Sequence, residues 1–258
     1  MRAEANIKSL QSVALILLTS LVATYISAAI PSGKEVIASV ENRLWGKSVQ
    51  GEYEMTITTP HWQRTLKMNV WMQRPEKSFI RILSPAKEKG IGSLRLNNEM
   101  WNYLPKVERT LKVPPSMMLQ PWMGSDFSND DLVKESSVVE DYKHKLVAIE
   151  QIDNQSVYRI ESIPKPEAAV VWGKLVYRVR ASDLMPLRLE YFDERDRLIK
   201  TLIFSDVKKI NKRLLPTQWQ MKPTAKPENS TMVRIINAEF DQLVPGKVFT
   251  LRNLRKNK

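Results

Sequence analysis

The sequence predicts a mainly β protein, an antiparallel meander that curls into a barrel or half-barrel. Three observations support this class. Most segments alternate apolar and polar residues with a period of two, turn-forming residues recur at short intervals between them, and helical periodicity is scarce. Short strands with close, regular turns are typical of such a meander. A length of 258 residues fits one large all-β domain.

The beginning of the chain differs from the rest. Arg2 and Lys8 precede the apolar run Val13–Ile26, which is followed by small residues. This order is typical of a secretory signal peptide, and the run is shorter than the roughly 20 residues that a membrane-spanning helix needs. We therefore expect residues 1–29 to be a cleaved signal peptide and residues 30–258 to be a single domain in the periplasm of a Gram-negative bacterium. A retained membrane anchor is the alternative.

Cysteine is absent from the sequence, so the protein has neither disulfides nor a lipid-modified cysteine. The net charge is +12, to which Arg2 and Lys8 against Glu4 contribute +1, leaving +11 after cleavage. Such an excess attracts polyanions, but nucleic acid is a poor partner for an exported protein. An anionic lipid surface, a lipid headgroup, an acidic partner and a merely soluble basic surface remain open. The basic tail Arg252–Lys258 is expected to be a frayed terminus.

Two helices are predicted. In the first, Ser32 is placed to cap the N-terminus, Glu35 to complete a capping box, and Gly46 to end the helix, whose apolar face should pack on the sheet. A shorter helix is expected to begin at Ser128, because two aspartates follow this serine in the positively polarised first turn.

Strand patterns fill most of the remainder. Residues 51–59 place Tyr53, Met55 and Ile57 on one face, and residues 65–73 repeat the alternation after a turn at Thr59–Trp62. Further strands are predicted at 77–83, 93–98, 99–105, 108–113, 144–152, 156–163, 174–181, 187–193, 197–207, 216–222, 230–240 and 247–254.

The segment "PPSMMLQPWMGSDF", residues 114–127, is rich in soft apolar side chains. Three prolines and Gly124 prevent it from forming one regular helix. Because methionine is unbranched and polarisable, a methionine cluster adapts to several shapes. Two interpretations are open: a movable lid over a cavity that accommodates lipid, and a plug that fills one end of the barrel core.

The stretch 74–118, followed by "WMGSDFSNDDL" at 122–132, resembles the LolA-like family of outer-membrane lipoprotein-sorting proteins. More narrowly, it is similar to the branch commonly encoded beside RND-type or other lipid exporters. The elements that carry the resemblance are Pro75 with Arg81, the run Trp101, Tyr103 and Pro105, and the segment Met123–Ser128.

The resemblance implies a LolA/LolB-like fold: a curved, incompletely closed antiparallel barrel with an N-terminal helix and a lid of helix and loop. It also implies a periplasmic carrier that shields the acyl chains of a lipoprotein or lipid in an apolar cavity, between inner and outer membrane. We expect the partner to be an RND-type or ABC transporter of the inner membrane. We also expect transient contact with a membrane and a monomeric state. The alternative is an accessory module with a filled core that docks such a transporter.

An acyl chain in water costs about 0.8 kcal/mol per CH₂, so a carrier needs an apolar lining. We predict that this lining consists of Tyr53, Met55, Met68, Val70, Trp101, Tyr103, Met117, Met118, Trp122, Met123 and Phe127. Ordinary barrel core is the alternative for the strand residues. Candidates for contact with a headgroup or with the lid are Arg81, Arg95, Arg109 and Lys112. A solvated position at a strand edge is the alternative for these side chains.

Enzyme chemistry finds little support. The two histidines, His61 and His144, are not accompanied by a metal-ligand set, and no Gly-x-Ser-x-Gly motif occurs. The aspartates Asp126, Asp130 and Asp131 fit helix capping better than a calcium loop or a carboxylate pair. We expect no catalytic residue, no metal and no cofactor.

Overall fold

The computed structural model describes residues 30–134, 138–168 and 170–256. The predicted signal peptide therefore lies outside the described residues. The chain from Pro31 onward forms a compact unit of its own, and the description below concerns this unit.

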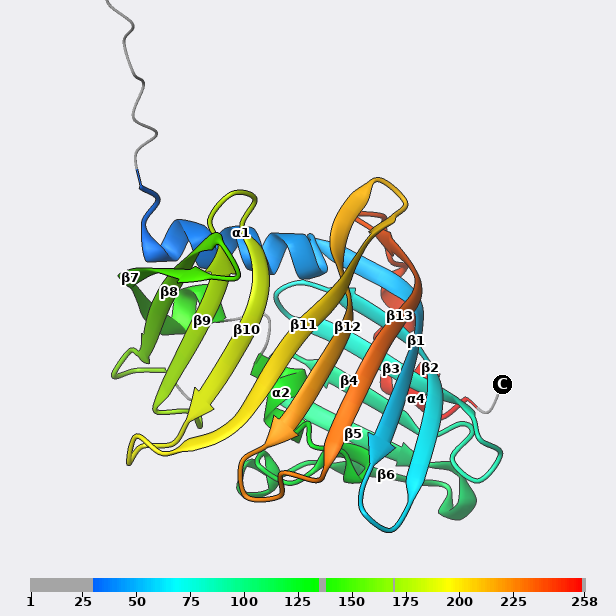
Figure 1. Ribbon diagram of the computed structural model, residues 1–258. Coiled ribbons are helices and arrows are strands. Elements are labelled where there is room, and N and C mark those ends of the chain that lie inside the picture. The colour runs from blue at the N-terminus through cyan, green and yellow to red at the C-terminus, as the bar shows by residue number, and fades with distance from the viewer. Residues whose placement is uncertain (1–29, 135–137, 169, 257–258) are drawn as a thin grey trace, which may run out of the picture. The chain divides into compact units, whose positions relative to one another are not determined.

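A 13-stranded sheet dominates the unit, and all neighbouring strands are antiparallel (Figure 1). Its strands are β1 Ser48–Thr58, β2 Gln63–Gln73, β3 Lys77–Ser84, β4 Gly92–Leu96, β5 Glu99–Leu104, β6 Arg109–Lys112, β7 Tyr142–Ile152, β8 Gln155–Pro164, β9 Lys174–Arg180, β10 Met185–Phe192, β11 Leu198–Ile210, β12 Arg213–Pro223 and β13 Ser230–Phe240.

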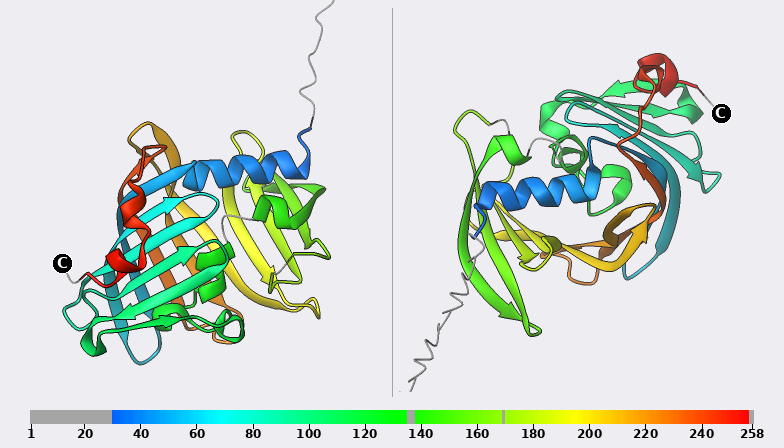
Figure 2. Two further views of the ribbon diagram at one scale, coloured as in Figure 1. Left: turned by 180° about the vertical axis from the view of Figure 1, so that it is seen from behind. Right: turned by 90° about the horizontal axis from the view of Figure 1, so that it is seen from above.

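The sheet curls without closing. Its order runs from β6 through β1, then β13, and on to β7, so that the first and last strands pair in the middle while β6 and β7 form the two edges. Register shifts occur in five of the pairings, β1 with β13, β2 with β3, β7 with β8, β9 with β10 and β10 with β11. Such bulges bend strands and increase their twist. The view from above shows the sheet wrapped around the helices (Figure 2). This confirms the predicted incomplete barrel.

The N-terminal helix α1, Gly33–Trp45, has the predicted ends. The Ser32 hydroxyl accepts from the Glu35 backbone N–H at 3.3 Å, and the Glu35 carboxylate accepts from the Ser32 backbone N–H at 2.7 Å. Gly46 follows the helix with a φ of 61°, a conformation that glycine adopts without strain. The buried face of α1 packs against β7, β10 and β12 inside the curl.

The connection between β6 and β7 has to cross the interior, because these two strands are the opposite edges of the sheet. It contains the short 3₁₀ turns η2 Pro115–Met117 and η3 Trp122–Gly124, then the helices α2 Asn129–Lys134 and α3 Val138–Asp141. We refer to residues 114–134 as the covering segment. Ser128 caps α2 as predicted, since its hydroxyl accepts from the Asp131 backbone N–H at 3.3 Å.

Apolar side chains form one cluster on the inner face of the sheet and a second on its outer face. The second cluster joins Phe79, Leu94 and Tyr103 of the sheet to apolar residues of the C-terminal segment, Val244, Phe249 and Leu254. A further 3₁₀ turn, η1 Pro105–Val107, connects β5 to β6.

The prediction of a strand over residues 247–254 is wrong. This part of the chain forms η4 Gly246–Val248 and the helix α4 Leu251–Leu254, which lies over the outer face of the sheet (Figure 2). Thr250 starts α4, because its hydroxyl accepts from the Asn253 backbone N–H at 3.1 Å. The prediction that the tail from Arg252 is frayed is also wrong for α4, since Leu254 is fully buried.

Candidate functional site

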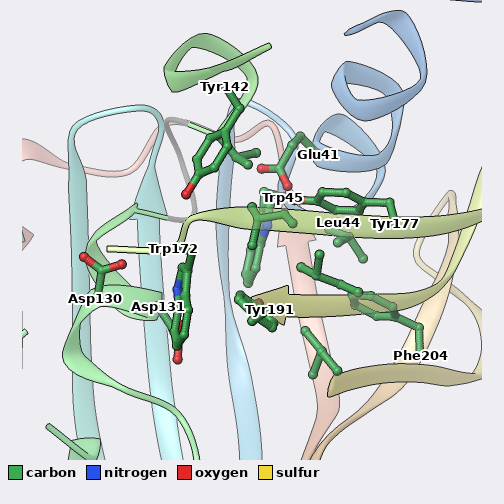
Figure 3. Close-up of a pocket in the computed structure, with 14 residues that line it drawn as sticks. Glu41, Leu44, Trp45, Asp130, Asp131, Tyr142, Trp172, Tyr177, Tyr191 and Phe204 are labelled. Atoms are coloured by element: carbon green, nitrogen blue, oxygen red, sulfur yellow. The ribbon is translucent and has the colours of Figure 1, made fainter. Parts of the chain in front are cut away.

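The inner face of the sheet encloses two small apolar cavities. The methionine cavity, of about 70 Å³, is lined by Trp45, Tyr53, Met55, Met68, Val70, Met72, Ser78, Ile80, Trp122, Phe127, Asp131, Leu132, Trp219 and Val233. The aromatic cavity, of about 50 Å³, is lined by Glu41, Leu44, Trp45, Asp130, Asp131, Val138, Tyr142, Trp172, Leu175, Tyr177, Leu189, Tyr191, Leu202 and Phe204 (Figure 3). Trp45 and Asp131 line both cavities, so the two spaces adjoin.

Strand alternation explains the methionine cavity. On β1 and β2 every second side chain points into the curl, and Met55 of β1 pairs with Leu66 while Tyr53 pairs with Met68. The neighbouring strand β3 adds Ile80 from the same face. The result is a wall of flexible methionines flanked by aromatic rings, which tolerates several ligand shapes better than branched residues do.

The covering segment forms the opposite wall of the methionine cavity. Its Trp122 and Phe127 are buried, whereas Met117 and Leu119 are about half exposed, at 48% and 55%. Met123 adopts a left-handed conformation with a φ of 52°, and Gly124 continues the turn with a φ of 72°. This turn brings the Trp122 ring inward and presents the Met123 carbonyl to the sheet.

Three side-chain contacts fasten the covering segment to the sheet near this turn. The Trp122 indole N–H donates to the Ser93 hydroxyl at 2.9 Å, and the Arg64 guanidinium donates to the Met123 carbonyl. The Thr231 hydroxyl donates to the Asp126 carboxylate at 2.7 Å. Burial raises the pKa of Asp126, against the lowering effects of this hydrogen bond and of nearby lysines.

A buried ion pair joins the covering segment to β11. Asp131 of α2 accepts from the ammonium of Lys200, and the two side chains are only 4% and 6% exposed. The same Asp131 oxygen accepts from the Ser128 backbone N–H at 2.7 Å. The ammonium also lies 4.8 Å from the centre of the Trp172 ring and 4.9 Å from that of Tyr191, within the range of cation–π attraction.

A second buried acid faces the aromatic cavity from α1. Glu41 accepts from Arg74 at 3.2 Å, and Arg74 also donates to the Gly46 carbonyl at 3.3 Å. Burial raises the pKa of Glu41 to about 7, although the positive charge of Arg74 opposes the shift. Burial also raises the pKa of Tyr142 in the same cavity, and the neighbouring carboxylates add to this shift.

The structure places the predicted lining residues in four different settings. Six line the methionine cavity, namely Tyr53, Met55, Met68, Val70, Trp122 and Phe127. Met118 and Met123 are partly buried and pack on the same inner cluster, while Met117 is about half exposed. Trp101 and Tyr103 point to the other side of the sheet, where Tyr103 is buried under the C-terminal segment, so neither can line the cavity.

The four predicted cationic contacts also lie away from the cavities. Arg81 is buried on the outer face and donates to the carbonyls of Gly90 at 2.6 Å, Asn253 at 2.8 Å and Leu254 at 2.9 Å. It therefore holds the C-terminal segment rather than the covering segment. The buried Arg95 donates to the carbonyls of Pro75 and Asn97.

The other two cations are exposed on edge strand β6. Lys112 pairs there with Glu99 and lies over the Trp101 ring, while Arg109 begins the strand. Lys112 pairs with Trp101 on the outer face, so it is not placed to contact a headgroup bound inside the curl. Arg109 pairs with Leu104 and is exposed at the edge of the sheet, where it lines neither cavity.

Several residues of the site were not predicted from the sequence. Met72 and Ile80 continue alternations that the sequence displays, so period two could have found them. Lys200 interrupts the apolar run of β11, which is a weak signal for a paired charge. The aromatic residues Trp172 and Tyr191 could not be assigned to a cavity, because only the curl brings strand β10 and the connection before β9 under α1.

No metal centre is evident in the described part of the chain, where no three His, Cys, Asp or Glu side chains converge. His61 is exposed in the β1–β2 turn, and His144 contacts the Ser162 hydroxyl at 2.7 Å. None of the helices in the described ranges is both long and apolar enough to cross a membrane.

Fold and inner face together define a class of protein: a curved, open antiparallel sheet that holds an apolar interior beneath a helix and a covering segment. Solved structures that share this fold include three that each cover most of this chain. A DUF1329 family protein from Desulfovibrio piger is 24% identical with a TM-score of 0.78, with 86% of this chain and 97% of that chain covered. A putative outer membrane lipoprotein-sorting protein domain from Vibrio parahaemolyticus is 22% identical with a TM-score of 0.76, covering 87% and 98%.

The third is a LolA superfamily protein from Nitrosomonas europaea, 20% identical with a TM-score of 0.75, covering 86% of this chain and 99% of that one. A family model described as uncharacterized protein-like matches residues 74–256. The chain belongs to the family that this model describes. The LolA-like fold that the sequence resemblance implies is confirmed by the three solved structures. No curated protein matches the chain.

Proposed function

We propose that this protein is a periplasmic carrier that shields the acyl chains of a lipoprotein or lipid on its way between the inner and outer membranes. The observation that carries the proposal is the methionine cavity, whose wall belongs partly to the sheet and partly to the covering segment. A cavity of this construction opens when one segment moves, without unfolding of the sheet.

The chemistry of the inner face fits an acyl chain. Burying a methylene group contributes about 0.8 kcal/mol, and the methionine cavity offers almost entirely apolar contacts, with Ser78 and Asp131 as the polar exceptions. Methionines such as Met55 and Met68 can follow a chain that adopts several conformations, because their own side chains are unbranched.

Cavities of about 70 and 50 Å³ correspond to a closed state. Ligand sites usually measure about 300–1,000 Å³, so cargo enters only if the covering segment moves outward. The segment is fastened by a few polar contacts, among them those of Trp122, Asp126 and Asp131. Its exposed Met117 and Leu119 show that part of its apolar surface is already turned to solvent.

The solved structures similar to this chain include proteins described as belonging to the LolA superfamily or to outer membrane lipoprotein-sorting domains. Their likeness favours a sorting or carrier role in the periplasm and a protein without enzymatic activity. The same proposal includes export of the protein with cleavage of residues 1–29 and a single mature domain over residues 30–258. It also includes loading by an RND-type or ABC transporter and a monomeric state.

A second candidate function is an accessory module that docks an inner-membrane transporter and binds no lipid. The small volume of the two cavities favours it, since a filled core needs no movement of the covering segment. The two candidates differ in one measurable property, namely whether the interior takes up an acyl chain.

The test is native mass spectrometry, with lipid extraction, on protein purified from the periplasm without detergent, and on the Val70→Phe variant. Val70 lines the methionine cavity, and the larger ring would fill it. We expect an acyl species to co-purify with the wild type and its retention to fall at least about tenfold in the variant, a loss of about 1.4 kcal/mol.

Lys67→Phe is the matched control, because Lys67 lies on the same strand with its side chain exposed on the outer face. Thermal melting of both variants checks that they fold. A wild type that carries no acyl species and takes up no lipid or lipopeptide in vitro would overturn the carrier proposal and leave the docking module.

A further inference from the structure

Lys200 is a buried cation on the inner face of the sheet. It lies on β11 beside Leu202, which lines the aromatic cavity, and its ammonium is held between the Trp172 and Tyr191 rings and the carboxylate of Asp131. Asp131 lines both cavities, so it stands between the Lys200 ammonium and the space that a ligand would enter.

A buried ion pair is weak evidence for stability. The free energy needed to remove two charges from water is about as large as the free energy gained from their attraction. Apolar residues of similar volume often stabilise a fold equally well. The second carboxylate oxygen of Asp131, Oδ1, is buried without a hydrogen-bond partner among the described residues. The pair is therefore imperfectly satisfied, which argues for a role other than holding the fold together.

The two charges belong to parts of the molecule that separate when the interior opens. Lys200 is fixed in the middle of the sheet, whereas Asp131 belongs to the covering segment. If this segment moves outward, Asp131 reaches water, where a carboxylate is well hydrated. Lys200 stays inside beside two aromatic rings, and a buried ammonium without a partner is costly. An anion from the incoming ligand would replace the lost carboxylate.

The other charges that face this region favour an anion once the segment has moved. Asp126 and Asp130 also belong to the covering segment and leave together with Asp131. Asp141 of α3 remains near Tyr142. Glu41 on α1 also remains, and it is paired with Arg74. Its pKa of about 7 means that a large fraction of it is uncharged at neutral pH.

On the basis of the carrier function proposed above, we infer that Lys200 binds the anionic headgroup of an amphiphile whose acyl chain occupies the adjoining apolar cavities. A carboxylate and a phosphate monoester share the required chemistry, since each accepts hydrogen bonds from an ammonium through charged oxygens. Asp131 occupies the headgroup position in the closed state and is displaced by the ligand.

The experiment measures the binding of three amphiphiles with the same chain length: hexadecanoate, monohexadecyl phosphate and neutral hexadecanamide. Affinities are read from tryptophan fluorescence, since Trp45 and Trp172 line the aromatic cavity. We expect the wild type to prefer at least one anionic probe over the amide by about tenfold or more, and the better of the two anions identifies the headgroup class.

The decisive variant removes both charges, Asp131→Asn together with Lys200→Met, so that neither charge is left buried alone. We expect its preference for the anion to fall to about onefold while its affinity for the amide stays within about threefold of the wild type. Lys200→Arg keeps the charge and should keep the preference. Asp131→Asn alone should bind the anion more tightly, because the competing carboxylate is gone.

Lys208→Met is the control, because it removes an exposed lysine from the same strand. Equal binding of anionic and neutral probes by the wild type, or an unchanged preference in the double variant, would overturn this inference and leave the carrier function standing. Failure of the wild type to bind any of the three probes would overturn both.

Discussion

The indole N–H of Trp122 donates to the Ser93 hydroxyl at 2.9 Å, and that hydroxyl in turn donates to the Asn102 side chain at 2.7 Å. One aromatic residue of the covering segment is thereby fastened to two adjacent strands, β4 and β5. The contact is buried, so it is protected from competition by water.

Replacing Trp122 with Phe should loosen the covering segment locally. The variant loses one buried hydrogen bond, worth about 1 kcal/mol, and some ring volume, so the opening free energy should fall by about 1–3 kcal/mol. Hydrogen exchange is the measurement. The Ser125 and Asp130 amides, which bond within the covering segment, should exchange faster, while strand amides stay unchanged. Trp62→Phe, at an exposed tryptophan, is the control; equal acceleration in both variants would contradict the prediction.

Replacing Arg64 with Met should destabilise the folded, closed protein more strongly than replacing Trp122 with Phe does. Arg64 donates to the Met123 carbonyl and pairs with the buried Glu88 at 3.4 Å, so the variant leaves both acceptors without this donor. We expect a loss of about 2–3 kcal/mol in the free energy of unfolding, measured by urea denaturation. Adding Glu88→Gln should recover part of it, because the uncompensated carboxylate is then removed. No recovery in the double variant would mean that Glu88 is not coupled to Arg64.

Replacing Arg81 with Met should release the C-terminal segment from the outer face. Three backbone carbonyls lose a charged donor, and two of them belong to α4. The expected cost is about 2–4 kcal/mol, with faster tryptic cleavage at Lys247 and Arg252 than in the wild type. Arg109→Met, on the exposed start of β6, should change neither property. An Arg81 variant as resistant as the wild type would show that α4 is held by its apolar contacts alone.

Glu41 should make stability fall as the pH rises. Its folded-state pKa of about 7 lies above the unfolded value of 4.5, so the folded protein holds the proton more tightly. The contribution is fully present below about pH 4.5 and is lost as the pH rises through 7, by at most about 3 kcal/mol. Denaturation of the wild type and of Glu41→Gln at pH 4.5 to 8 measures it. The variant should show a flatter profile over this range, and identical slopes would contradict the assignment to Glu41.

Local patterns were sufficient for much of the fold. The capping box of Ser32 and Glu35 and the cap at Ser128 were predicted because a cap depends on residues three apart. Strand alternation identified one face of β1 and β2 correctly, because it also depends only on residues that are close together in the sequence. The strand expected at 247–254 failed because Thr250 starts a helical turn there, and because Phe249 and Leu254 pack on an outer face that local periodicity does not reveal.

The site was predicted only in part because both faces of several strands carry apolar residues. Trp101 and Tyr103 alternate correctly for a lining strand, yet they point outward under the C-terminal segment. Period two separates the two faces of a strand, but it does not say which of them is concave. That choice depends on which distant segment covers each face.

The sequence by itself determined the class of fold, the position of the first helix and the soft, proline-broken segment between β6 and β7. These features depend on neighbours within a few residues. Only the tertiary structure decided that this segment crosses the inner face, that Arg81 holds the C-terminus, and that Lys200 meets Asp131, 69 residues earlier in the chain. The physical reason is that the curl of the sheet places its two edges around one interior, and no local pattern specifies which side chains meet there.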